Sequence, residues 1–173
     1  MVEKSEETKT DQISKLISEL HHPDSLERQK ARYALIAIGQ EAGPGLVEVV
    51  ANERGHARWE AIEALGRIRY RDAAEALVEA ILDDDTGVRW AASNALIELD
   101  RAALKPLLLT LTQYSDSPWF RTGAHHVLHV LKDWGHLLPK EIKVFEALEG
   151  VEPMVAVPWV AEDALRDLEK KQD

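Results

Sequence analysis

The sequence contains no cysteine among its 173 residues. Disulfides, thiolate zinc sites and cysteine nucleophiles are therefore excluded. Proline and glycine are scarce, with 7 and 9 copies, and they stand between periodic segments. Val, Ile and Thr do not alternate as they do in strands, whereas the helix formers Leu, Ala, Glu and Arg dominate. This composition predicts an all-α protein.

Positive charge is also in deficit, since 21 Lys and Arg face 31 Asp and Glu, for a net charge of −10. A general nucleic-acid binder needs a basic face that displaces counterions from phosphates, so we expect no nucleic-acid partner. No apolar run approaches the ~18 residues that span a bilayer, and the charged start lacks the apolar segment of a signal peptide. We therefore expect a cytoplasmic protein with no membrane partner, whose residues 1–10 form a disordered charged tail.

What the sequence does contain is an internal repeat. An arginine is followed by Ala at +3, Ala or Val at +6, Leu at +7, and Ile or Leu at +10, which places the apolar residues on one face of a helix. The arginines are 30, 31 and 32 residues apart. The four copies begin at Arg28, Arg58, Arg89 and Arg121.

A second apolar series precedes each copy and marks a first helix. Its members are Ile17 and Leu20, Val47 and Val50, Val78 and Ile81, Leu108 and Leu111, and Phe145 and Leu148. A helical hairpin cannot bury its apolar face alone, so such units stack. We predict one right-handed α-α superhelix, a HEAT/armadillo-like solenoid over residues 11–173. Its five hairpins are expected at about 11–39, 43–69, 71–100, 101–132 and 140–170.

The segment from Asp83 to Leu96, Asp-Asp-Asp-Thr-Gly-Val-Arg-Trp-Ala-Ala-Ser-Asn-Ala-Leu, resembles the PBS-lyase-type HEAT repeat. The resemblance covers residues 11–132 well and the remainder loosely. It implies that the repeated arginines form a structural ladder, in which they bind acidic loop residues of the same or a neighbouring repeat. The available acids are Asp24, Asp84, Asp85 and Asp116. Asp24, Asp85 and Ser117 also precede second helices, where they can act as N-caps.

The second helices leave one face outside the core, because positions +1, +5 and +8 from each arginine point away from the apolar stripe and +4 lies at its flank. In a HEAT stack these helices usually line the concave surface. Two tryptophans at the same outward position indicate an interface, since Trp and Tyr are favoured anchors. The predicted partner-binding residues are Tyr33, Ile36, Trp59, Ile62, Trp90, Ile97, His126 and His129.

The most direct interpretation is a non-catalytic scaffold that binds a protein partner through this face. Two alternatives are that a homodimer covers the tryptophans and that they pack within the chain. Trp119, Trp134 and Trp159 are expected instead to pack the joint between the fourth and fifth hairpins. Glu60 and Glu63 are expected on the solvated surface.

Enzymatic alternatives have less support in the residues. HEAT-repeat iron hydroxylases need His-Glu pairs, with His where this chain has Trp59, and no His-Glu dipeptide occurs. His125 and His129 are one turn apart but lack a third ligand, so we expect no metal and no cofactor. A phycobilin-lyase-like subunit that handles a chromophore remains the second interpretation, although basic residues for the pigment propionates are few.

Overall fold

The computed structural model describes residues 2–170, with side chains from residue 8 onward. This range forms ten α-helices and three short 3-10 helices, without a strand, which confirms the all-α prediction. Residue 1 of the predicted tail and residues 171–173 of the predicted solenoid lie outside the described range.

The first eight helices form four hairpins, each made of a first and a second helix. They are α1 (Val2–Glu19) with α2 (Ser25–Ile38), α3 (Gly43–Asn52) with α4 (Gly55–Ile68), α5 (Ala74–Ala80) with α6 (Thr86–Leu99), and α7 (Leu104–Gln113) with α8 (Pro118–Asp133). The short helices η1 (Gly39–Ala42), η2 (Arg71–Ala73) and η3 (Asp100–Ala103) join consecutive hairpins. A fifth hairpin consists of α9 (Pro139–Leu148) and α10 (Pro153–Glu169).

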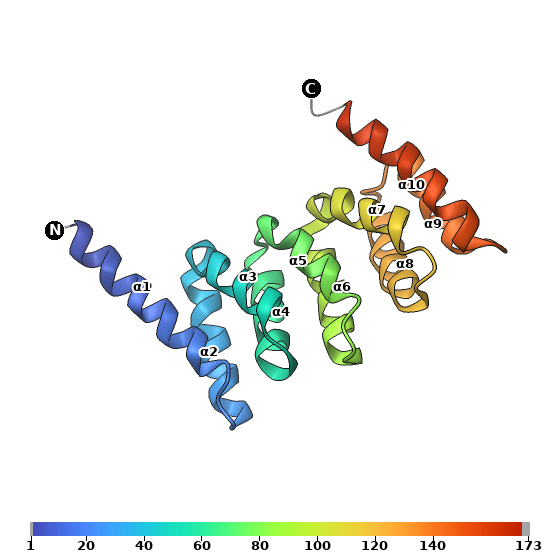
Figure 1. Ribbon diagram of the computed structural model, residues 1–173. Helices are drawn as coiled ribbons and strands as arrows, with labels where there is room; N and C mark the ends of the chain where they lie inside the picture. Colours follow the sequence, from blue (N-terminus) through green and yellow to red (C-terminus); the bar gives the residue numbers. More distant parts are fainter. Residues whose placement is uncertain (1, 171–173) are drawn as a thin grey trace.

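The hairpins stack into a row of two layers (Figure 1). First helices contact first helices and second helices contact second helices, and the second-helix contacts are the more extensive. Gly66 of α4 shows how close this layer packs, since a Cβ there would lie 2.9 Å from Ala95 of α6. Tighter packing in one layer bends a stack toward that layer, so the second helices lie on its inner side.

The core is the repeated stripe that the sequence predicts. The alanine at +3 and the leucine at +7 of every copy are at most 3% exposed. These residues are Ala31 and Leu35, Ala61 and Leu65, Ala92 and Leu96, and Ala124 and Leu128. Small residues let the second helices approach closely while the leucines fill the space toward the first helices, so the arginine frame is confirmed.

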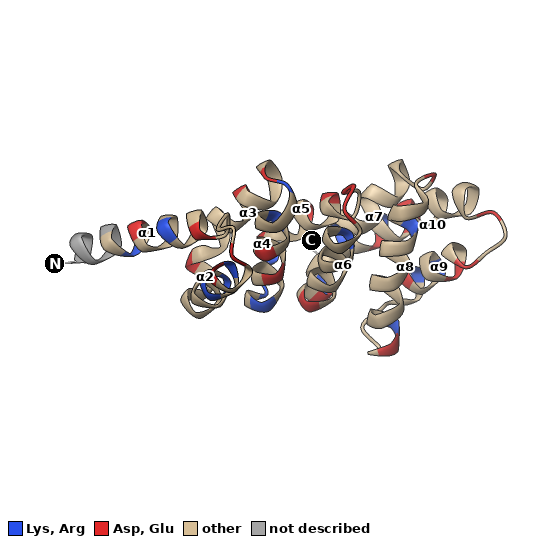
Figure 2. Cartoon of the chain, turned by 90° about the horizontal axis from the view of Figure 1, so that it is seen from below, with Lys and Arg blue, Asp and Glu red and all other residues tan. Residues whose placement is uncertain are grey.

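The fifth hairpin departs from the expected order of layers. Here α9, expected in the first-helix layer, packs on α8, and α10, expected in the second-helix layer, packs on α7. Figure 2 accordingly shows α9 in one row with α6 and α8, and α10 in the other with α5 and α7. Sequence spacing identified the buried face of α10, where Val157, Ala161 and Ala164 are buried, but spacing does not specify the layer.

Two polar contacts hold this crossing in place. Arg101 in η3 donates from Nη1 and Nη2 to the carboxylate of Glu141 at 3.1 and 2.9 Å, and Glu141 is almost fully buried. Beside it, His136 Nδ1 lies 2.9 Å from the Asp100 carboxylate. Because these contacts bind the loop after α8 and the first turn of α9 to η3, α9 is directed back along α8 instead of crossing to the outer layer.

The start of the chain also differs from expectation. The sequence predicts a disordered tail over residues 1–10, but α1 begins at Val2. Glu and Lys in this segment are good helix formers, so it continues the helix that Ile13 and Ile17 anchor to the core. Lys9 also forms an ion pair with Glu41 of η1.

One stretch, residues 25–52, is long and apolar enough by composition to cross a membrane, which is weak evidence because core helices pass the same test. In the structure it comprises α2, η1 and α3. Gly39 adopts a φ of 83° after α2, and Leu35, Leu46 and Val50 from both helices are fully buried in the solenoid core. The stretch is therefore two packed helices joined by a turn.

Candidate functional site

Three of the second helices, α2, α6 and α8, begin at a side-chain N-cap, whereas Arg54 before α4 makes no such hydrogen bond. Asp24 accepts a hydrogen bond from the Leu26 backbone N–H at 2.8 Å, and Asp85 accepts from Gly87 at 2.6 Å. Ser117 accepts from the Phe120 N–H at 3.3 Å, before Pro118 begins α8. These caps are as the sequence predicts.

The repeated arginines do stabilise the hairpins, but mainly through backbone groups. Arg28 donates to the carbonyl groups of His22 and Pro23 at 2.8 and 3.0 Å. Arg89 donates to those of Asp83 and Asp84 at 2.7 and 2.9 Å. Arg121 donates likewise to the Ser115 carbonyl. The carboxylates of Asp24, Asp84, Asp85 and Asp116, predicted as partners in the same or a neighbouring repeat, are therefore not bound by these three arginines, because the turn presents its carbonyl oxygens at the position that each guanidinium reaches. Arg28 pairs instead with Glu60 of the next hairpin.

Arg58 is the exception, since it forms an ion pair with Asp83 of the following hairpin. Both side chains are 7% exposed, so this pair is a buried connection between the second and third hairpins. Asp83 was not among the acids expected to fill this role.

The face of the second helices that points away from the first helices, at positions +1, +5 and +8, is hereafter called the B face. Of the predicted partner-binding residues, Tyr33 and Trp90 are both 58% exposed there, and His129 is exposed. Ile36, Trp59 and His126 are half-buried. Ile62 is fully buried and Ile97 is 8% exposed, so their assignment to the partner surface is wrong.

The buried isoleucines have a common cause. Ile62 is at position +4, which the helical wheel places at the flank of an isolated helix. In the stack this flank faces the next second helix, so the +4 residues Arg32 and Ser93 are buried as well, whereas His125 in the last copy is half-buried. Ile97, at +8, is covered to a similar extent because α4 and α6 approach so closely at Gly66.

The two B-face tryptophans contact opposite neighbours. The Trp59 ring lies against Arg32 of α2, with the guanidinium carbon 5.1 Å from the ring centroid. Trp90 stacks on His126 of α8, with ring centroids 4.6 Å apart. The B face thus has two aromatic clusters, one over the first two hairpins and one over the third and fourth.

The second cluster includes Trp119, which the sequence analysis assigned to the joint of the last hairpins. Trp119 is 53% exposed and lies under the Arg89 guanidinium, 4.4 Å from its carbon to the ring centroid. Together with Trp90 it lines a largely apolar hollow of about 180 Å³. The hollow is lined by Ile81, Thr86, Arg89, Trp90, Ser93, Trp119, Thr122, Gly123 and His126.

Gly123 explains why a hollow forms between α6 and α8. A Cβ at this position would lie 2.5 Å from Ile81 and 3.0 Å from the Ser93 hydroxyl. The glycine therefore lets α8 approach α6 at its base while the tryptophans stand apart at its rim. The sequence signal for this site was the pair Pro118-Trp119 at a helix start. It places Trp119 one helical turn before Thr122, which is the +1 position of the fourth copy.

Trp159 does not pack the joint either, and Trp134 contacts it only through the His136 ring, with centroids 5.6 Å apart. Trp134 and Trp159 are 52% and 73% exposed, and Trp159 shares an exposed apolar face of α10 with Met154 and Val155. The joint is instead fastened by the Arg101–Glu141 contact.

Glu60 was expected on the solvated surface, but it is buried between α2 and α4. Its carboxylate lies 3.7 Å from Arg28 and 2.9 Å from Arg32. Burial raises the pKa of Glu60, an effect that the charges of Arg32 and Arg28 oppose. Glu60 is at position +2, which faces the preceding second helix. A helical wheel of one helix cannot reveal this contact.

The histidines of α8 have partners other than one another. His125 lies 3.2 Å from Glu149 and stacks on Phe145, and His129 lies 3.4 Å from Asp133. Burial, followed by the charges of His129 and His125, lowers the pKa of His126. Among the described residues no group of three or more His, Asp or Glu is placed to hold a metal ion.

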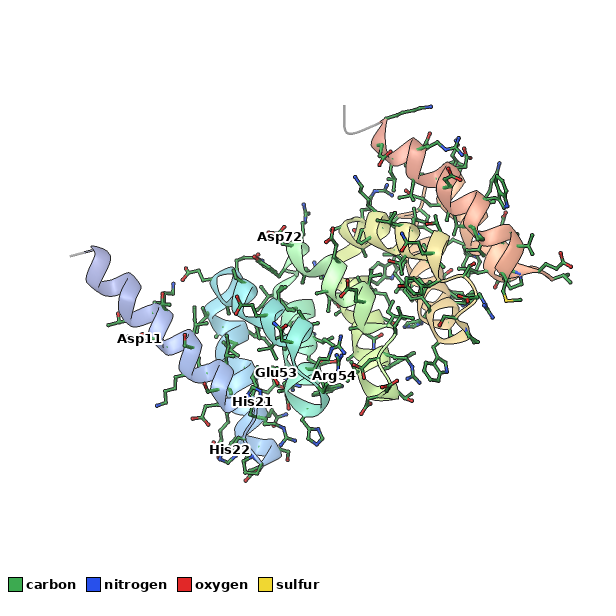
Figure 3. The ribbon with its side chains drawn as sticks, viewed as in Figure 1. Asp11, His21, His22, Glu53, Arg54 and Asp72 are labelled. Carbon is green, nitrogen blue, oxygen red and sulfur yellow. The ribbon has the colours of Figure 1, made fainter. Side chains whose placement is uncertain are left out.

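The first-helix side of the stack carries a different set of groups. Figure 3 shows His21 and Glu53 approaching each other where α1 and α3 end, and their side chains lie 3.6 Å apart. They border a groove of about 520 Å³ between α1 and α3. The groove is lined by no Trp, Tyr or Phe side chain, which distinguishes it from the B face.

Comparison with known proteins identifies the protein family. Residues 13–97 and 43–129 match the family of HEAT repeats, and the chain belongs to that family. A solved structure with a similar fold is the complex of CpcE and CpcF of phycocyanin lyase from Nostoc sp. PCC7120, with a TM-score of 0.60 and 24% sequence identity. The match covers 90% of this chain and 98% of that one. No curated protein matches the sequence.

Proposed function

We propose that this chain is a non-catalytic cytoplasmic scaffold that binds a protein partner through its B face, with Trp90 and Trp119 as the anchors. The observation that carries the proposal is that both indoles, each more than half exposed, line one apolar hollow. The exposed part of a tryptophan at the rim of a hollow contributes little to folding, whereas at interfaces Trp and Tyr account for much of the binding energy.

The size of the hollow favours a side chain of a partner protein as its occupant. About 180 Å³ accommodates one aliphatic or aromatic side chain, whereas pockets for whole small molecules are ~300–1,000 Å³. The rigid rims supplied by the Arg89–Trp119 and His126–Trp90 contacts reduce the entropy lost on binding. A protein partner also agrees with the fold likeness to CpcE and CpcF, which were solved as a complex.

A chromophore-handling role like that of phycocyanin lyase is the second candidate. The fold likeness and the Trp-lined hollow favour it, and a pigment would extend beyond the hollow along the B face. Incubation of the purified protein with a linear tetrapyrrole, followed by gel filtration, distinguishes the two candidates. A visible absorption band that elutes with the protein supports the chromophore role, and a colourless protein supports the scaffold.

The scaffold proposal is tested by affinity capture from the native host followed by reconstitution with the purified partner. The variant Trp90→Ala/Trp119→Ala is compared with Trp159→Ala, which removes an exposed tryptophan elsewhere. The double variant is expected to weaken partner binding more than about tenfold and to leave thermal stability nearly unchanged. Equal binding by both variants refutes the proposal, and a change from dimer to monomer in the double variant assigns the face to self-association.

A further inference from the structure

Three charged side chains are buried between α2 and α4, and their charges do not cancel. Arg28, Arg32 and Glu60 are 8%, 9% and 5% exposed. Glu60 is the only acidic residue in the described part of the chain that forms an ion pair with either arginine. Because a guanidinium stays protonated in proteins, the cluster retains one uncompensated positive charge.

In the described part of this cluster, the buried polar atoms without a hydrogen-bond partner are Arg28 Nε, Arg32 Nη1 and Glu60 Oε2, and Arg32 is the arginine that donates no hydrogen bond at all. Arg28 donates two hydrogen bonds to the carbonyls of His22 and Pro23, as a member of the arginine ladder. Arg32 Nη1 forms an ion pair with Glu60 at 2.9 Å, but the contact is poorly aligned and Nη1 has no hydrogen-bond partner. Among the described residues, Arg32 Nε and Nη2 donate no hydrogen bond to another group of the protein. A buried guanidinium with free donors is costly unless a partner completes it.

Two aromatic rings place this guanidinium at the B face. The Arg32 guanidinium carbon lies 5.2 Å from the centroid of Tyr33 and 5.1 Å from that of Trp59. Both contacts are within the range of cation–π attraction, which stabilises the charge while leaving its N–H groups unused. Tyr33 is 58% exposed, so the position borders solvent on the surface where the partner is proposed to bind.

We propose that Arg32, Tyr33 and Trp59 form a carboxylate-binding position that takes an Asp or Glu side chain of the protein partner. This inference rests on the proposed scaffold function. A carboxylate matches the free edge of a guanidinium in shape and accepts two parallel hydrogen bonds from it. The flanking rings contact the apolar residues on either side of the acid, so the position recognises an acidic residue within an apolar segment.

The local charges favour a single negative charge. One carboxylate neutralises the excess charge of the two arginines and Glu60. A doubly charged phosphate would leave the position negative, beside Glu63, whose charge also acts on Glu60. His56 is the further titratable group that acts on Glu60.

The test uses three probes and the indole N–H signal of Trp59 in NMR spectra, assigned with Trp59→Phe. The probes are the blocked peptide Ala-Leu-Glu-Leu-Ala, its Gln counterpart, and sodium acetate. We expect the Glu peptide to shift the Trp59 signal saturably, at a concentration at least about tenfold below that of either other probe. Equal binding of the Gln peptide, equal binding of acetate, or no shift with the Glu peptide overturns the proposal.

Variants on both sides of the ion pair make the test specific. Arg32→Gln should abolish the response, Lys30→Gln on the exposed side of the same helix should leave it unchanged, and Arg32→Lys should weaken it because an ammonium lacks the planar fork. The isosteric Glu60→Gln should tighten binding of the Glu peptide several-fold, since it frees Arg32; weaker binding in this variant contradicts the proposal. These measurements need no partner, so their failure is distinguishable from loss of capture through Trp90 and Trp119.

Discussion

The indole ring of Trp90 stacks on the imidazole of His126, with 23° between the ring planes. His126 Nε2 also lies 3.2 Å from the Asn94 side-chain oxygen. Because burial and the neighbouring His129 and His125 lower the pKa of His126, the folded state keeps this ring neutral where the unfolded chain already binds a proton. Its contribution to stability is therefore present above the unfolded pKa of ~6.5 and declines as the pH falls below it.

We expect the unfolding free energy to decrease more between about pH 7 and about pH 5.5 in the unmodified protein than in His126→Gln. Gln retains a polar contact with Asn94 but does not titrate. The measurement is urea unfolding at several pH values, with Trp fluorescence as the probe. An equal pH dependence in the two proteins would show that His126 does not control stability in this range.

The Arg58–Asp83 ion pair connects the second and third hairpins, and we expect Asp83→Asn to destabilise the fold by ~3–5 kcal/mol. The cost arises because Arg58 would remain buried without a negative partner. Asn can still accept the Asp85 N–H, so the turn is preserved. Glu98→Gln is the matched control, since it breaks the exposed Arg69–Glu98 pair and should cost less than about 1 kcal/mol. Similar losses in the two variants would argue against a stabilising role for the buried pair.

Gly66→Ala tests the close approach of α4 and α6. Replacing a helical glycine with alanine ordinarily stabilises a protein by ~0.5–1 kcal/mol. Here the new Cβ would lie 2.9 Å from both Cα and Cβ of Ala95, so we expect a loss of ~1–3 kcal/mol in chemical unfolding. Adding Ala95→Gly should recover part of the loss, and a more stable single variant would show that the helices are farther apart than described.

Arg101→Met tests what holds the last hairpin. Glu141 is 1% exposed, and this change removes its cation while the Leu138 N–H still donates to it. We expect faster amide hydrogen exchange in α9 and α10, with protection of α4 and α6 retained. Lys105→Met, which removes an exposed partner of Glu169, is the control. Uniform loss of protection along the chain would mean that the hairpin does not open separately.

The sequence predicts the repeat, the arginine frame and the buried alanine–leucine stripes, because these depend only on helical period and repeat length. It does not predict the burial of Ile62, Ser93 and Glu60, because a helical wheel describes one helix and these positions are covered by neighbouring second helices. The carbonyl partners of Arg28 and Arg89 were missed for a related reason, since backbone groups have no residue-type signature.

In the candidate site, too, some features follow from the sequence pattern and others depend on how neighbouring helices pack. Exposure of Trp90 and Tyr33 follows from their register, whereas Trp119 joins the site only because Gly123 lets α8 approach α6. The layer of α9 was not predictable from its apolar spacing, which is the same for either layer. The determinants are Arg101 and Glu141, which are 40 residues apart in sequence.

The exchange of layers in the fifth hairpin limits how the array can lengthen. A copy of residues 71–100 inserted after residue 100 would present a first and a second helix to neighbours of the same kind on both sides. In the fifth hairpin the inner-row helix α9 precedes the outer-row helix α10, the reverse of the order in every earlier hairpin. A segment that connects α10 to a further copy would therefore have to begin in the outer row. A repeat added there would therefore need a connecting segment different from η1, η2 and η3, each of which follows a helix of the inner row.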